Sequence, residues 1–467
     1  MLFNSLHFIV FFLFVTTTYY TLPGRWRWFS LLTASAYFYA SFIPAYLLLL
    51  GIIIVFDYLA GICIESLSGR LRRGMLVMSI LANVGFLCFF KYFDFLNANV
   101  AEVLGFAGIG YTSEALTDWY PGLALPIGLS FHTFQSMSYT IEVYRGNQRA
   151  ERHFGIYALY VLFYPQLVAG PIERPQNVLW QFRERMDFDW GNLRTGLWWM
   201  VWGMFKKVVI ADRLALVTDP IFAHPETQHA GSLAIAAVFY SIQIYCDFSG
   251  YSDIALGAAR TMGFRLMVNF RSPYFARSIA EFWQRWHISL STWFRDYVYI
   301  PMGGNRCGNI RTYANLLIVF LLSGLWHGAD WKFVVWGAIH GVLLIFTRVT
   351  GAGVFDFARW PGWLRTALTF TAVTLAWIFF RAHSISDALL IMRTLATPAL
   401  WALPVLPISN GETVFSLMLI VLLFSKEYLL PDYVPAPKSF WPSLGVATLL
   451  CYLWGVFGSN QFIYFQF

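Results

Sequence analysis

Long apolar runs separated by short polar segments dominate the chain. These runs approach or exceed the roughly 20 residues that a helix needs to cross about 30 Å of hydrocarbon. The clearest of them are Leu6–Leu22, Tyr46–Ile64, Gly74–Phe90, Ser232–Leu256 and Thr366–Phe380. This pattern predicts an all-α polytopic membrane protein with about ten to twelve transmembrane helices.

The same pattern leaves no room for a separate soluble domain. The first run has neither a basic stretch before it nor a small-residue cleavage site after it, so we interpret it as a retained span rather than a signal peptide. We find no internal repeat and no linker rich in Pro, Gly or Ser. We therefore expect residues 1–467 to form a single membrane-embedded domain that ends in an aromatic tail, residues 459–467.

Two polar segments interrupt the apolar pattern in the middle of the chain. Phe205–Arg213 joins Lys206 and Lys207 to a hydrophobic stretch, which predicts a helix lying at the cytoplasmic interface. Further along, Asp247 and Asp253 stand inside an otherwise apolar helix. A carboxylate at this depth is costly unless it has a partner or faces a wet cavity, so both aspartates indicate a functional site.

A third segment, Glu281–Arg311, carries charged and aromatic residues too densely to span lipid. Charged or irregular backbone is tolerated at membrane depth only where it is buried in protein or lines a water-filled cavity. We therefore expect a re-entrant element that forms the wall of an internal tunnel. Gly303, Gly304 and Asn305 supply the residues for a tight turn within it.

The composition agrees with a membrane protein and assigns the basic charge to loops. Of the 467 residues, 58% are hydrophobic and only 12% are charged, against about 25% charged residues in soluble domains. The formal net charge is +7, but its arginines follow alternate spans, which argues against a nucleic-acid partner and predicts that these loops face the cytoplasm. The arginines are Arg25, Arg27, Arg70, Arg72, Arg73, Arg145, Arg149 and Arg152. Counting spans from these loops places both termini outside the cytoplasm.

Two of the nine histidines stand in unusual surroundings. His287 lies inside the charged third segment, and His327 ends an apolar run between Gly324 and Gly328, where small residues leave room for a substrate. A histidine within a membrane exchanges protons near neutral pH and marks a functional site, whereas the alternative is a core histidine bonded to a backbone carbonyl. For His327 we favour a functional role, and for His340 on the next helix we favour packing.

The chain ends in NQFIYFQF, where Phe462, Phe465 and Phe467 surround Tyr464 without any charged side chain. An interfacial aromatic belt accounts for this composition. A chemical role is the alternative, because a phenol has a pKa of about 10 and leaves readily from an ester. A base such as His327 would then take the phenol proton during attack on a thioester.

Several other chemistries lack their motifs. The sequence contains no nucleotide-binding P-loop, no zinc-protease motif and no hydrolase nucleophile elbow. The five cysteines are scattered through the chain without metal-binding spacing. We therefore expect neither a metal nor a bound cofactor.

Two motifs together resemble the membrane-bound O-acyltransferase (MBOAT) family, in its bacterial branch of alginate, peptidoglycan and cellulose O-acetyltransferases. They are Glu281–Arg306 and, shortly after it, Gly324–Gly341. Other stretches resemble the same branch, namely Leu125–Gly146, Phe163–Pro175, Ile244–Gly257 and Asn269–Trp283. The resemblance covers most of the chain and implies the MBOAT fold, in which helices surround a central tunnel.

The resemblance also implies roles for particular residues. His327 matches the family's tunnel histidine, and His287 matches a second histidine in the preceding motif. Phe462–Phe467 fits a C-terminal F-x-Y-F-x-F signature, whose tyrosine looks like an acyl relay in related surface-polymer systems, and Tyr464 occupies its place. A partner is implied as well: an SGNH-type transferase on the periplasmic side that passes the acetyl group to a polysaccharide.

These observations lead to one expected mechanism. Acetyl-CoA, or another acyl thioester, approaches from the cytoplasm, where Lys206, Lys207 and Arg213 attract its phosphates. His327 acts as general base, and Tyr464 accepts the acetyl group. The residues expected to line or hold the tunnel are Asp247, Asp253, Arg285, Trp286, Asn305 and Trp326. The chain would then be a multi-pass enzyme of the bacterial inner membrane that serves exopolysaccharide O-acetylation, of the alginate, cellulose or peptidoglycan type.

Two other classes of protein stay open at this point. A transporter or flippase of a polysaccharide export system explains Asp247 and Asp253, but it gives no reason for His327 or the aromatic tail. A non-enzymatic subunit that scaffolds a polymer synthase is the second alternative. Polymer export that continues without the chain would exclude the first, and loss of acetylation in His327→Ala would exclude the second.

Overall fold

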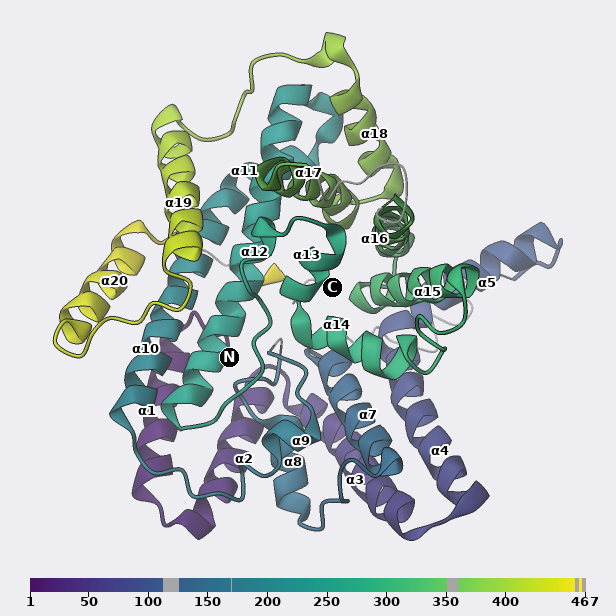
Figure 1. Ribbon diagram of the computed structural model, residues 1–467, viewed down its shortest axis with the longest axis vertical. Helices are drawn as coiled ribbons and strands as arrows, with labels where there is room; N and C mark the ends of the chain where they lie inside the picture. Colours follow the sequence, from purple (N-terminus) through teal and green to yellow (C-terminus); the bar gives the residue numbers. More distant parts are fainter. Residues whose placement is uncertain (112–125, 169, 351–359, 458–461, 464–467) are drawn as a thin grey trace. The chain divides into compact units, whose positions relative to one another are not determined.

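A computed structural model describes most of the chain (Figure 1), namely residues 1–111, 126–168, 170–350, 360–457 and 462–463. All regular elements of these residues are helices, which confirms the all-α class. The chain divides into two compact units. The first consists of Met1–Gly196 with Ala255–Met267, and the second of Leu197–Ile254 with Val268–Phe467.

Five helical stretches of the described residues are long and apolar enough to cross a membrane. They are Pro44–Ser66, Gly69–Phe106, Ala230–Thr261, Trp331–Thr350 and Gly362–Arg381. Two shorter apolar helices, Leu6–Thr21 and Phe440–Trp454, fall on further apolar runs of the sequence. By length and composition, these stretches indicate a polytopic membrane protein.

In the first unit, a central helix buries many polar side chains. This helix, α7 (Leu129–Arg145), packs against α3 (Pro44–Ser66) and α4 (Gly69–Leu87). Several of these polar groups have partners inside the protein: Gln135 donates to the carbonyl of Tyr160, and Thr133 donates to the carbonyl of Leu129. Such pairing lowers the cost of burying polar groups. The other elements of the unit are α1 (Leu6–Thr21), α2 (Gly24–Ala40), a π-helix (Cys88–Tyr92), α5 (Phe93–Phe106), α8 (Phe154–Leu162) and α9 (Pro175–Val178).

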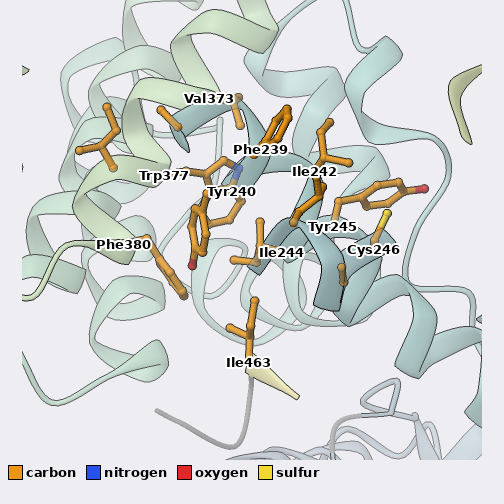
Figure 2. Packing of buried hydrophobic residues seen from close by; sticks show 14 of the residues in the cluster. Phe239, Tyr240, Ile242, Ile244, Tyr245, Cys246, Val373, Trp377, Phe380 and Ile463 are labelled. Atoms are coloured by element: carbon orange, nitrogen blue, oxygen red, sulfur yellow. The ribbon is translucent and has the colours of Figure 1, made fainter. Parts of the chain in front are cut away.

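The second unit is built around α12 (Ala230–Thr261), most of which belongs to it. Tyr240 and Ile244 of this helix pack in one buried apolar cluster with Trp377 and Phe380 of α17 (Gly362–Arg381), as Figure 2 shows. The other elements are the end of α10 (Trp190–Met204), a π-helix (Phe205–Ala211), α11 (Asp212–Ala223), α13 (Ile279–Arg285), α14 (Ile288–Phe294), a second π-helix (Arg295–Tyr299), α15 (Asn309–His327), α16 (Trp331–Thr350), α18 (Ile385–Ala396), α19 (Asn410–Leu429) and α20 (Phe440–Trp454).

Helices α15 and α16 form a hairpin in close backbone contact (Figure 1). A Cβ atom added at Gly324 would lie 2.1 Å from the carbonyl oxygen of Phe333, and one added at Gly337 would lie 2.2 Å from that of Phe320. Side chains other than glycine do not fit at such distances. The two glycines therefore set the separation of the hairpin that carries His327.

We expect Gly337→Ala to destabilise the protein by about 1–3 kcal/mol, because the added methyl group forces the two helices apart. The matched control is Gly445→Ala in α20, where an added Cβ meets nothing within 4 Å and alanine is the better helix former. Thermal unfolding in detergent micelles checks this expectation. Equal midpoints for the two variants would contradict the close contact between α15 and α16.

Candidate active site

The position of His327 follows from the turn between α15 and α16. His327 is the last residue of α15, and Gly328 begins the turn in an extended conformation. A Cβ atom at Gly328 would lie 2.1 Å from the ring of Phe333, so the turn requires glycine there. Asp330 caps the next helix by accepting the amide of Lys332 at 2.9 Å. This short turn places the imidazole against α16, where the ring centroids of His327 and Trp336 lie 5.1 Å apart.

His287 sits at a break between two short helices. Its φ of 43° lies in the left-handed region, which side chains other than glycine rarely occupy. The helix α13 ends at Arg285 with Trp286 as its C-cap, and His287 is the N-cap residue of α14. Asn269 provides hydrogen-bond acceptors for the first backbone amides of α14. Its carbonyl accepts the amide of Ile288 at 3.0 Å, and its Oδ1 accepts the amide of Ser289 at 3.2 Å. The strain at His287 turns its ring into the protein.

The two predicted histidines are brought together in the second unit. The ring centroids of His287 and His327 lie 6.5 Å apart, and the side chains are 0% and 5% exposed, respectively. Aromatic rings surround them: Phe248 lies 4.7 Å from His287, and Phe380 lies 5.4 Å from His327. Burial lowers the pKa of His287 to about 3, which keeps its imidazole neutral at pH 7. The two buried imidazoles in this cage of Phe248, Trp326, Trp336 and Phe380 can supply a proton acceptor and a hydrogen-bond donor for group transfer.

The expected wall residues fall into three groups, of which the two tryptophans are the first. Trp326 lies beside both histidines, with ring distances of 6.1 Å to His287 and 5.0 Å to His327. Trp286 is buried in the neighbouring aromatic core, 5.1 Å from the ring of Trp377. These two tryptophans therefore fill space in and behind the cage.

Arg285 and Asn305 are placed differently from the tryptophans. Arg285 pairs with Glu281 one helical turn away at 2.7 Å, and both side chains are partly exposed. Asn305 lies in an exposed turn, where its Oδ1 accepts hydrogen bonds from Tyr299 and Arg348. The turn itself matches the prediction, since Gly303 and Gly304 adopt positive φ angles.

The buried lysines and aspartates of the second unit form an ionic network. Lys207 Nζ lies 2.6 Å from Asp247 and 2.9 Å from Asp212, while Lys206 Nζ lies 2.6 Å from Asp253. Asp247 and Asp253 belong to α12, and the lysines belong to the π-helix that follows α10. The partners that intramembrane carboxylates require are therefore these two lysines.

This arrangement corrects the expectation of an interfacial helix at Phe205–Arg213. Every residue of the π-helix Phe205–Ala211 is buried, with Lys206 and Lys207 only 3% and 1% exposed. Arg213 is occupied too, because its Nη2 donates to the carbonyl of Trp454 at 2.7 Å. Lys206 and Lys207 are thus engaged in buried ion pairs, whereas the Arg213 side chain is 13% exposed. That these three cations attract the phosphates of a donor stays a prediction.

The aromatic tail meets the same network at its described residues. Phe462 and Ile463 are buried, and the backbone amide of Ile463 donates to Asp247 Oδ2 at 2.8 Å. Ile463 also belongs to the apolar cluster of α12 and α17, below Ile244 in Figure 2. Tyr464, the expected acyl relay, follows directly in sequence but lies outside the described residues.

Sequence reasoning missed two further carboxylates. Asp57, in the span α3, is buried and accepts hydrogen bonds from Ser79 at 2.7 Å and Asn83 at 2.8 Å. Glu427, in α19, accepts the hydroxyl of Tyr245 at 2.5 Å. The signal was available for Asp57, because it interrupts an apolar run in the same way as Asp247 does.

Apolar helices long enough to cross a membrane and a pair of buried imidazoles fit a membrane-embedded enzyme, and comparison with known proteins gives its family. The family model described as MBOAT, membrane-bound O-acyltransferase family, matches residues 123–385. The chain belongs to this family, which confirms the prediction from its motifs. It is a polytopic membrane enzyme of the O-acyltransferase class.

Individual relatives extend the similarity along the chain. The probable alginate O-acetylase AlgI of Pseudomonas aeruginosa is 38% identical over 451 residues, which cover 94% of this chain and 84% of the relative. The peptidoglycan O-acetyltransferase of Helicobacter pylori is 36% identical over 402 residues, which cover 79% of this chain and 73% of the relative. A teichoic acid D-alanyltransferase of Streptococcus thermophilus is 28% identical over 282 residues, which cover 54% and 68%, respectively.

Proposed function

We propose that this enzyme transfers an acetyl group from acetyl-CoA, through Tyr464, to a polysaccharide outside the cytoplasm, of the alginate, cellulose or peptidoglycan type. The observation that carries the proposal is the joint placement of two features in one unit. His287 and His327 face each other in an aromatic cage, and the residue before Tyr464 is anchored in the apolar core next to that cage. The names of the two O-acetylating relatives support an acetyl group as the cargo.

In the proposed reaction, His327 takes the proton from the Tyr464 hydroxyl while the phenolate oxygen attacks the thioester carbonyl. The carbon–oxygen bond forms, the carbon–sulfur bond breaks, and the thiolate of CoA leaves with the proton returned by the imidazolium. His287 donates a hydrogen bond to the carbonyl oxygen as it gains negative charge. The products are free CoA and O-acetylated Tyr464, whose phenyl ester retains its transfer potential.

The second half of the proposal concerns delivery. A periplasmic SGNH-type transferase takes the acetyl group from Tyr464 and places it on a polymer hydroxyl. This requires the tail to reach the outer side of the bacterial inner membrane, so we propose that about ten to twelve spans cross the membrane and that both termini are periplasmic. The basic loops of the first unit, including Arg70 and Arg145, then face the cytoplasm.

Intact-protein mass spectrometry after incubation with acetyl-CoA tests the proposal. We expect one added acetyl group on the wild-type chain, localised to its C-terminal peptide, and none on Tyr464→Phe or His327→Ala. Tyr428→Phe is the matched control, because this exposed tyrosine lies on α19 away from the tail in sequence. An adduct that persists in Tyr464→Phe would contradict the relay, and polymer acetylation without any adduct would indicate direct transfer.

A further inference from the structure

We infer that Asp247 is the positioning residue that docks the C-terminal tail, and that Lys207, which also pairs with Asp212, holds this carboxylate in place. The inference deepens the proposed function and rests on it, because the docked tail carries Tyr464, the proposed acyl acceptor. The contacts of Asp247 themselves do not depend on this chemistry. They join a helix of the membrane interior, a buried lysine and the two described residues of the tail.

The two oxygens of Asp247 have separate partners. Oδ1 accepts from Lys207 Nζ at 2.6 Å, and Oδ2 accepts from the backbone amide of Ile463 at 2.8 Å. The side chain is 2% exposed. Because hydrogen bonds to an ionised group in a water-free surrounding are among the strongest in proteins, this amide is held at a fixed point of the tail.

Lys207 contributes to the tail as well as to Asp247. Its ammonium lies 4.5 Å from the centroid of the Phe462 ring, within the range of a cation–π contact. The same ring meets Tyr251 of α12 edge-to-face, with centroids 5.0 Å apart. Phe462 is therefore held between the π-helix and α12, one residue before the amide that Asp247 binds.

Two contacts upstream lead the chain towards this dock. Arg213 donates to the carbonyl of Trp454 at the end of α20, and the amide of Val456 donates to the carbonyl of Val208 at 2.8 Å. Val208 directly follows the two lysines in the π-helix, and Arg213 lies just after that helix. The charged network thus binds the main chain of the tail. In this way it fixes the point from which the residue after Ile463 continues the chain.

The sharpest test removes the donor and leaves the network intact. Ile463→Pro lacks the amide hydrogen that Asp247 binds, whereas Ile463→Val keeps both the hydrogen and a buried aliphatic side chain. The readout is the rate at which carboxypeptidase trims the tail of the full-length protein in micelles, followed by intact mass. We expect trimming to become roughly 10- to 100-fold faster in Ile463→Pro, the range given by the loss of a hydrogen bond to a charged group.

Asp247→Ala provides an independent variant and should raise the trimming rate in the same range, while Asp253→Asn, on the same helix, should not. Unchanged trimming in both Ile463→Pro and Asp247→Ala would overturn the docking role. The acetyl adduct is measured on the same samples. If trimming is faster in Ile463→Pro and Asp247→Ala but the wild-type protein carries no acetyl adduct, the docking role holds and the acyl relay is rejected. The two ideas can therefore fail separately.

Discussion

His327→Ala is expected to lower acetyl transfer by about 10²–10⁴-fold, the usual contribution of a general base. The alanine removes the imidazole that ends α15 and lies 6.5 Å from the ring of His287. The cavity left behind is lined by Trp336 and Phe380, which cannot accept a proton. Release of free CoA by the purified protein, measured with a thiol reagent, reports the rate.

The matched control for this variant is His224→Ala. His224 is an exposed histidine at the end of α11 that pairs with Glu226 at 3.4 Å, and we expect its loss to change the rate less than twofold, within the roughly neutral effect of surface substitutions. Both variants should elute as the wild type does in size-exclusion chromatography. CoA release at the wild-type rate in His327→Ala would remove this histidine from the mechanism and restore the scaffold interpretation.

Lys207→Met is expected to destabilise the protein by about 3–5 kcal/mol, the usual cost of breaking a buried ion pair from one side. The methionine leaves Asp212 and Asp247 with two buried negative charges and no shared ammonium group. Thermal unfolding in micelles, together with the yield of folded protein, measures the effect. Lys438→Met, at an exposed lysine, is the control.

A rescue variant distinguishes the contribution of the Lys207 charge to stability from that of its side-chain packing. Lys207→Met combined with Asp212→Asn and Asp247→Asn replaces the ions by neutral groups of similar volume, an exchange that is often neutral for stability. We expect most of the lost stability to return in this triple variant. A triple variant that is no more stable than Lys207→Met would show that packing of the lysine chain, rather than its charge, supports the fold.

Much of the fold could be predicted because membrane helices follow a simple length rule. The runs Tyr46–Ile64 and Ser232–Leu256 each lie inside a single helix, α3 and α12. The motif around His327 was also informative, because the glycine after it is required by contact with Phe333. Steric requirements of this kind depend on residues that are close together in the sequence, so they can be predicted from it.

Contacts between residues far apart in the sequence were harder to predict. Lys206 and Lys207 looked interfacial because two of their partners, Asp253 and Asp247, lie on another helix, with Asp247 40 residues after Lys207. The pattern within one segment does not show such a pairing. The contact between His287 and His327 depends on a left-handed residue and a helical hairpin that packs elsewhere in the unit. The docking of Ile463 uses a backbone amide, which leaves no trace in residue type.

The buried ion pairs also constrain how the protein is made. A helix that enters a bilayer with an unpaired aspartate at its centre meets a cost of about 2.5–3.5 kcal/mol for each carboxylate, and α12 carries Asp247 and Asp253. Lys206 and Lys207 leave the ribosome first and carry the opposite charge. We therefore expect the cost of inserting α12 to fall when the earlier segment is close enough for its lysines to pair with these aspartates.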